Sequence, residues 1–304
     1  MAATTTSYFV EFLRLALPLV LALGLAAYLD RQLDRRRLLP PGFRSAPRRA
    51  AGFAIVASVL LLGVFLTAAN ADRAGEIDTS QLTTPQLFVL HLLLLASLGA
   101  WFVLGYVVPR PVAVAREPED ALGPAPIPPP RPSYLRIFAD QFGLRPRRVA
   151  REIAIGLGIG VASWIGVLMV VAAIALSMAA LGGGKFLPTE PSSVIPWMAA
   201  LPIAVRVLLA TSAGVVEELF FRGFLQPRIG VVLSTACFAL AHLSYGQPFL
   251  LVGVTLLSLV YSALVTWRQS LWAAIVAHAL FDGIQLLVVI PMALRYVQNS
   301  GAAG

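Results

Sequence analysis

Long runs of apolar residues, about eight in all, constrain the fold of this 304-residue chain more than any other feature. A helix needs about 20 apolar residues to cross the hydrocarbon layer of a bilayer. Inside that layer only helices and closed barrels satisfy their own backbone hydrogen bonds. Apolar residues make up 58% of the chain and charged residues 12%, and no sustained two-residue alternation marks a membrane barrel. The sequence therefore predicts an all-α, polytopic transmembrane helical bundle.

The predicted spans form two blocks separated by a linker. The first block, residues 1–109, holds three spans and no motif that we identify, and the linker covers residues 110–152. The second block covers residues 153–304. The eight spans are expected near residues 8–29, 51–69, 87–108, 153–181, 196–226, 231–245, 249–267 and 271–292. The fifth is too long for one straight crossing, so we expect it to be tilted or broken near Gly214, and the sixth is short for a full crossing.

The net charge of +8 comes mainly from arginines in the predicted loops. It therefore indicates membrane topology and not a nucleic-acid partner. The loop after the first span is rich in arginine, whereas the next loop carries three acidic residues and one arginine, namely Asp72, Glu76, Asp78 and Arg73. The first loop and the arginine-rich segment 109–152 are thus expected on the cytoplasmic side, with both termini outside. We also expect these arginines to be attracted to anionic lipid headgroups.

Two kinds of segment are expected inside the linker. Residues 109–132 are rich in proline, so we expect an extended, semi-rigid connection there. Residues 134–151 mix apolar side chains with arginines, a pattern typical of a helix that lies on the cytoplasmic membrane surface. An ordinary solvated connector fits that pattern equally well.

The first polar motif of the second block lies inside a predicted span and comprises Glu217, Glu218 and Arg222. Charged side chains within a membrane cost at least about 2.5 kcal/mol each and usually mark a functional site. Glu218 and Arg222 are four residues apart in the favourable order for an ion pair on one helix face. Glu217 points about 100° away from that face. One carboxylate is therefore expected to be neutralised, while the other stays available as a base or a ligand, although a structural charge cluster is the alternative.

Two further motifs follow on later spans. Phe238 and His242 lie one helical turn apart and share a face. His278 and Asp282 are also four apart, which suits either an oriented catalytic histidine or two metal ligands. The third histidine of the chain, His91, has no polar companion at helical spacing in its own span, so we expect it to have a structural role.

These motifs are predicted to lie at one depth in the membrane. The turn near Pro227–Gly230 and the connector near Arg268–Ser270 should lie on the same membrane side. At about 1.5 Å per residue, Glu217, His242 and His278 are then about 12 to 18 Å from that side. The carboxylates and two imidazoles can therefore converge near the middle of the membrane.

A buried cluster of carboxylates and imidazoles is suited to hydrolysis by water. In one version, His242, His278 and a carboxylate of Glu217 or Asp282 bind a divalent metal, most plausibly zinc, and leave an open position for water. In the other version no metal takes part. Glu217 and His242 then activate water, while His278 and Asp282 stabilise the oxyanion. The sequence leaves both versions open.

The three motifs together resemble those of the CPBP family of intramembrane proteases. They are Glu-Glu-x-x-x-Arg at 217–222, Phe-x-x-x-His at 238–242 and His-x-x-x-Asp at 278–282. The family includes the CAAX prenyl endopeptidases of eukaryotes and bacterial proteins related to bacteriocin immunity and lysostaphin resistance. The resemblance covers residues 194–295. It implies a membrane-embedded endopeptidase that acts on a membrane-anchored protein or peptide, which in the eukaryotic branch is prenylated.

The resemblance also implies roles for individual residues. The catalytic residues would be Glu217, His242, His278 and Asp282, with Glu218, Arg222 and Phe238 in support. The last motif of the family commonly ends in asparagine, and the aspartate found here slightly favours a charged or metal-linked role.

Alternative functions fit the sequence less well. The His-Glu-x-x-His pattern of zinc-dependent intramembrane proteases is absent because Leu243 follows His242, and Ser212 lacks the setting of a serine nucleophile. A proton-coupled transporter would use the same acids and histidines, but no internal repeat is present. A non-catalytic immunity or scaffold protein of the same family is the other alternative, although no motif residue is missing. We expect a multi-pass protein of a bacterial plasma membrane.

Overall fold

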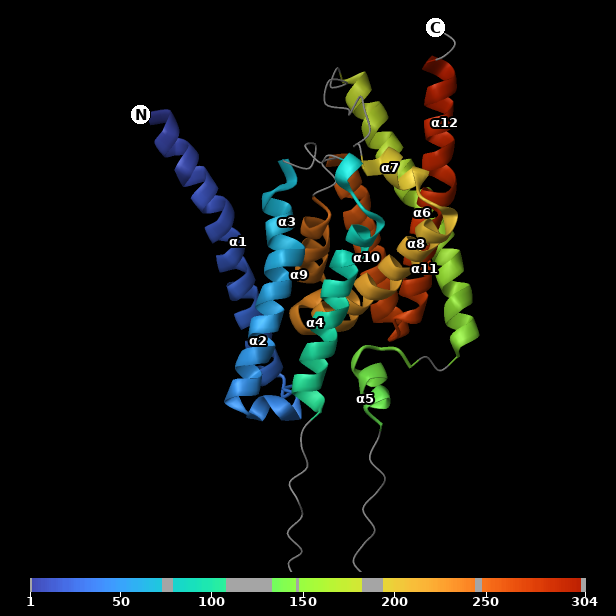
Figure 1. Cartoon of the computed structure of the whole chain (residues 1–304). Coiled ribbons are helices and arrows are strands. Elements are labelled where there is room, and N and C mark those ends of the chain that lie inside the picture. The colour runs from blue at the N-terminus through green and yellow to red at the C-terminus, as the bar shows by residue number, and fades with distance from the viewer. Residues whose placement is uncertain are drawn as a thin grey trace, which may run out of the picture.

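The chain folds into a bundle of helices that run mainly along one axis (Figure 1). The computed structural model describes residues 2–72, 79–107, 133–145, 148–181, 194–243 and 248–301. Within these ranges the structure contains no β-strand. The predicted all-α membrane bundle is confirmed.

Three long helices form the first block. They are α1 (Ala2–Arg35), α2 (Ala46–Leu60) and α4 (Val89–Tyr106). A π-helical turn, η2 (Leu61–Phe65), extends α2 into α3 (Leu66–Ala69). Short 3-10 helices lie between them, at η1 (Pro41–Arg44), η4 (Thr79–Gln81) and η5 (Thr84–Phe88). These helices pack against the second block. For example, Trp101 of α4 packs edge-on against Phe224, with ring centroids 4.9 Å apart.

A short helix, α5 (Tyr134–Gln141), closes the lower end of the bundle in Figure 1. Its Phe138 packs against Phe102 of α4, with ring centroids 5.2 Å apart. Phe142 is almost fully buried, while Leu135 is 83% exposed. A helix is therefore present in the segment 134–151, shorter than expected, and one face of it is docked on the protein. That it lies on the membrane surface stays a prediction. The proline-rich stretch 109–132 lies outside the described residues.

The second block contains the remaining helices. They are α6 (Val149–Ala180), α7 (Val194–Ala200), α8 (Ile203–Glu217), the π-helix η7 (Glu218–Leu225), α9 (Gln226–Ala241), α10 (Pro248–Arg268), α11 (Trp272–Ile284), the π-helical turn η9 (Gln285–Val289) and α12 (Ile290–Gly301).

Six helices of the described chain are long and apolar enough to cross a membrane, and up to seven if a bent pair counts as one span. The count of eight spans from the sequence is therefore approximate. The bent pair consists of α7 and the unit 203–241, which meet at 119°. The break falls at Pro202 and not near Gly214, because proline excludes the preceding residue from helical geometry.

Gly214 instead allows a close approach between α8 and α11. A Cβ atom on Gly214 would lie 2.8 Å from the backbone nitrogen of Ala279. On the other side of α11, a Cβ atom on Gly156 of α6 would lie 2.7 Å from the carbonyl oxygen of Ala273. Small residues let membrane helices approach to backbone contact. Helix α11 is thus held between α6 and α8, which fixes the position of His278.

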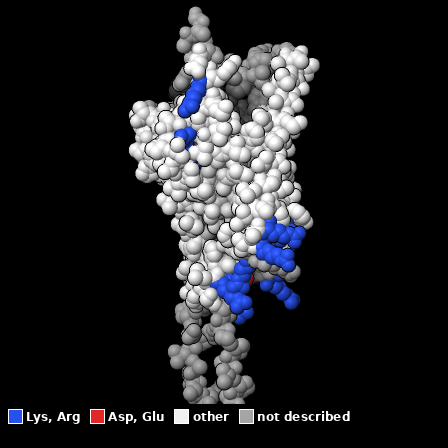
Figure 2. Space-filling model, turned by 90° about the vertical axis from the view of Figure 1, so that its right-hand side faces the viewer, with Lys and Arg blue, Asp and Glu red and all other residues white. Residues whose placement is uncertain are grey.

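The distribution of charge agrees with the predicted loops. The turn after α1 and the helix α5 lie at the same end of the bundle, and the start of α1 and the end of α12 lie at the other (Figure 1). On the face shown in Figure 2, most of the Lys and Arg side chains gather at the end that carries α5. The described parts of the two arginine-rich segments therefore lie at the same end of the bundle. That this end is the cytoplasmic one stays a prediction.

The close packing of α11 can be tested with a matched pair of glycines in α6. Gly156→Val should destabilise the protein by about 1–3 kcal/mol, because the added side chain meets backbone atoms of α11. Gly158→Val serves as the control, since an added Cβ there has no neighbour within 4 Å. The midpoint of thermal unfolding in detergent is the measurement. Equal midpoints for the two variants would contradict the close contact.

Candidate active site

The two adjacent glutamates lie where α8 passes into the π-helix η7. The wider turn of a π-helix is often found at functional sites. All eight residues of η7 are buried, and Glu217 is only 7% exposed. This segment therefore holds both carboxylates inside the protein and directs them to different neighbours.

Glu218 makes the ion pair that its spacing to Arg222 predicts. The Nη1 atom of Arg222 donates to Oε1 of Glu218 over 2.7 Å, and both side chains are fully buried. The same Glu218 oxygen lies 2.8 Å from Nδ1 of His278, which comes from α11. The guanidinium of Arg222 also lies 4.2 Å from the ring centroid of Phe238. Glu218 thus joins η7 to α11 through one carboxylate oxygen, and Arg222 adds a contact with α9.

Glu217 faces a different pair of side chains, both histidines. Its Oε2 atom lies 3.7 Å from Nε2 of His242, and its Oε1 atom lies 3.5 Å from Nε2 of His91. Oε2 is buried and accepts no hydrogen bond from any described residue. The structure therefore contains one carboxylate that pairs with an arginine, Glu218, and one that faces two histidines, Glu217.

The tautomer of His242 follows from its backbone contact. Its Nδ1 atom lies 2.7 Å from the carbonyl oxygen of Phe238. A carbonyl oxygen can only accept, so Nδ1 carries the proton. The ring of Phe238 packs on the imidazole, with centroids 4.4 Å apart. His242 is therefore oriented so that Nε2 points to Glu217.

His278 and Asp282 complete the group. Nε2 of His278 lies 3.5 Å from Oδ2 of Asp282, whose side chain is 30% exposed. The ring of Tyr261 stacks on the imidazole, with centroids 5.3 Å apart. The structure thus brings together every residue that the three motifs contribute. We call Glu217, Glu218, Arg222, His242, His278 and Asp282, together with His91, the polar cluster.

The structure gives His91 a polar companion from another helix. His91 comes from α4 and is buried, and its Nε2 atom faces Glu217. Helical spacing within one span does not reveal this contact, because it is between helices. The small number of histidines was the one sequence signal that could have drawn attention to it, because all three of them fall in the polar cluster.

The side chains present do not fit the zinc version of the site. Across the described ranges, no three His, Cys, Asp or Glu residues are arranged to hold a metal ion. The two imidazoles expected to share a metal contact different glutamates instead, His242 with Glu217 and His278 with Glu218. We therefore derive no step through a metal.

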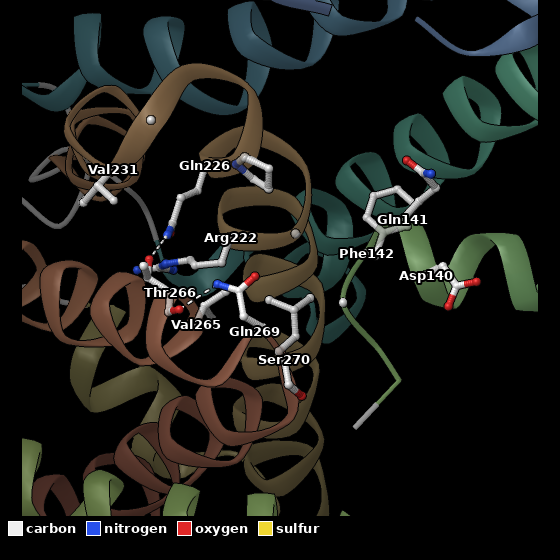
Figure 3. A pocket seen from close by; sticks show the side chains of 15 residues that line it. Asp140, Gln141, Phe142, Arg222, Gln226, Val231, Val265, Thr266, Gln269 and Ser270 are labelled. Atoms are coloured by element: carbon white, nitrogen blue, oxygen red, sulfur yellow. Dashed lines mark hydrogen bonds between the residues drawn. The ribbon is translucent and has the colours of Figure 1, made fainter. Parts of the chain in front are cut away.

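A cavity of about 440 Å³ opens at the end of the bundle that carries α5 (Figure 3). Its wall includes Arg222, Gln226 and Thr266, and the amide of Gln226 donates to the hydroxyl of Thr266 over 3.1 Å. The rest of the wall is mixed, with apolar side chains such as Phe142 and Val265 and polar ones such as Asp140 and Gln269. Arg222 belongs to both this cavity and the polar cluster, so the two are connected through one side chain.

Residues 199–284 match the family model described as type II CAAX prenyl endopeptidase Rce1-like. This part of the chain is similar to an Rce1-like domain. The match is consistent with the CPBP family, so the resemblance seen in the three motifs is confirmed. The domain contains all three motifs but not His91. The protein is thus an integral membrane protein with a domain from a protease family.

One curated relative illustrates how far the similarity extends. It is the uncharacterized protein YpbD of Bacillus subtilis (strain 168), which is 33% identical over 69 residues. The aligned part is 22% of this chain and 36% of the relative, so the chain covers about a third of the relative's length. No solved structure matches the chain.

Loss of Arg222 should be costly because it leaves Glu218 buried with one cation fewer. We expect Arg222→Ala to destabilise the protein by about 3–5 kcal/mol, the usual cost of removing one partner from a buried pair. Arg145→Ala is the matched control, because Arg145 pairs with Asp140 over 3.0 Å at the surface, where ion pairs contribute little. Thermal unfolding in detergent compares the two variants. A midpoint for Arg222→Ala equal to that of the control would exclude the pair as a stabilising element.

Proposed function

We propose that the protein is an intramembrane endopeptidase in which Glu217 and His242 activate a water molecule. The observation that carries this proposal is the pair of atoms Oε2 of Glu217 and Nε2 of His242, which face each other over 3.7 Å. Because Nδ1 of His242 donates to a carbonyl, Nε2 of the neutral ring is an acceptor, and so is the carboxylate oxygen. A water molecule beside both atoms can donate one hydrogen to each.

The first step is attack of this water on a peptide carbonyl. The water oxygen forms a bond to the carbonyl carbon, and one water proton passes to Glu217, which acts as the general base. The electron pair of the C=O double bond moves to the oxygen and creates an oxyanion. His278 is the donor that we assign to that oxyanion, since its Nε2–H can point to it when both ring nitrogens carry protons. Asp282, 3.5 Å from Nε2, orients this side of the ring.

The second step breaks the peptide bond. Glu217 returns the proton to the departing nitrogen, the C–N bond breaks, and the oxyanion collapses to a carboxylic acid. Glu218 and Arg222 take no proton in this scheme. They hold His278 through the 2.8 Å contact between Glu218 Oε1 and Nδ1, and Phe238 holds His242 through its carbonyl and its ring.

We propose a membrane-associated protein or peptide as the substrate. The cluster is enclosed by helices that are long and apolar enough to lie in a membrane, so a substrate segment must reach it from the bilayer or from the cavity beside α5. The Rce1-like match supports a prenylated CAAX-type substrate. The plasma membrane of a bacterial cell is the proposed location.

The direct test is cleavage of membrane-anchored peptides, with and without a prenyl group, by the purified protein in detergent. Glu217→Gln should abolish cleavage, because the amide cannot take up the water proton, while membrane insertion and folding stay intact. Glu11→Gln in α1 is the matched control, since Glu11 is exposed and outside the polar cluster. Unchanged cleavage by Glu217→Gln would remove this residue from the mechanism.

Treatment with a chelator distinguishes the metal-free mechanism from a metal-dependent one. Cleavage by the wild type should be unaffected by a strong chelator, because the scheme uses only side chains. Loss of activity on chelation, restored by added zinc, would overturn the metal-free mechanism. Failure of the wild type to cleave any peptide of the set, at protein concentrations where folding is verified, would favour a scaffold role.

A further inference from the structure

We propose that His91 is a positioning residue of the active site, and that the first helical block therefore completes a site otherwise built by the Rce1-like domain. This inference rests on the proposed function of Glu217 as the base. His91 lies on α4, about one hundred residues before the matched region 199–284. Nothing in the motifs themselves requires a residue from that block.

His91 contacts two side chains of α8, one of which is the base. Nδ1 of His91 lies 3.0 Å from the hydroxyl oxygen of Ser212, and Nε2 lies 3.5 Å from Oε1 of Glu217. The imidazole is 7% exposed, so water does not replace these partners readily. Ser212 and Glu217 both belong to α8 and are five residues apart. His91 therefore bridges two points of the helix that carries the base.

The possible proton positions give His91 a defined role toward Glu217. The hydroxyl of Ser212 has one proton, which can go to Nδ1 of His91 or to the carbonyl oxygen of Leu209, 3.0 Å away. If the proton goes to His91, the neutral ring carries its own proton on Nε2. If it goes to Leu209, Nδ1 of His91 donates to Ser212, and Nε2 carries a proton when the ring is charged. In the first of these states, and in the second when the ring is charged, the Nε2–H bond points to an ionised Glu217.

This arrangement leaves each oxygen of Glu217 with a separate task. Oε1 faces His91 and Oε2 faces His242, so the carboxylate cannot rotate without losing one of these neighbours. The neighbouring Glu218 is held in a comparable way by Arg222 and His278. Catalysis depends steeply on such placement, since a shift of about 1 Å can cost about a hundredfold in rate. His91 thus keeps the Glu217 carboxylate in the position from which it can accept a proton from the attacking water.

The test compares variants of His91 and of its serine partner. We expect His91→Leu to lower kcat by about tenfold to a hundredfold with little change in KM, because the base is misplaced while the substrate site is not altered. His91→Gln should recover most of the lost kcat, since its amide N–H can still reach Glu217. Ser212→Ala should give a smaller loss. Thr211→Ala is the matched control, because Thr211 is exposed on the same helix and its hydroxyl, within the described chain, bonds to the carbonyls of Val207 and Leu208.

A measurement without cleavage keeps this inference separate from the proposed function. The chain has three histidines, so the side-chain ¹⁵N signals of His91 can be assigned in a bilayer sample. Glu217→Gln should shift the Nε2 signal of His91, whereas Glu11→Gln should leave it unchanged. An unshifted signal would overturn the contact itself. An unchanged kcat in His91→Leu, or equal losses for the Leu and Gln variants, would show that His91 only supports the fold. Normal cleavage by Glu217→Gln would instead refute the proposed function.

Discussion

The burial of two adjacent carboxylates among membrane-spanning helices is the constraint on which the rest of the structure depends. Each ionised side chain costs at least about 2.5 kcal/mol in such a place, so each needs partners within the protein. Glu218 obtains them from Arg222 and His278. Glu217 faces two imidazoles, whose charge depends on a proton. Glu218, which pairs with a permanently charged arginine, supports the structure. Glu217, whose neighbours are charged only when protonated, is suited to exchange protons.

The surrounding architecture serves to bring these partners to the glutamates. The π-helix η7 joins α8 to α9, and the non-helical backbone of Gly230 (φ 85°, ψ 169°) turns the chain so that His242 returns beside Glu217. Helix α11 is held at backbone contact by glycines of α6 and α8, which places His278 against Glu218. Helix α5 is anchored beside the start of α11. The backbone carbonyl of Gly143, just after α5, accepts a hydrogen bond from the backbone N–H of Leu271, just before α11 begins. Distant parts of the chain thus determine the geometry of two neighbouring residues.

Features that depend on spacing along one helix, and the convergence of the three motifs at one depth, could be predicted from the sequence. The individual side-chain contacts between helices could not. The Glu218–Arg222 pair needs only a four-residue interval, and the structure contains it. The contact between Glu218 and His278 joins residues 60 apart, and that between His91 and Glu217 joins two blocks of the chain. The long fifth span could be tilted or broken near Gly214, because glycine serves both breaks and close packing, and only the neighbouring helix reveals which applies. The count of eight spans was approximate because the bent unit around Pro202 counts as at most one span.

The most direct measurement is an experimental structure of the protein in a bilayer mimetic, bound to a peptide whose scissile group is replaced by a tetrahedral phosphinate. The account predicts that one phosphinate oxygen lies within hydrogen-bond distance of Glu217 and His242, where water would attack, and the other faces His278. It also predicts no metal ion between these side chains. A phosphinate bound away from Glu217, or one that reaches the protein through a metal ion, would contradict the central claim.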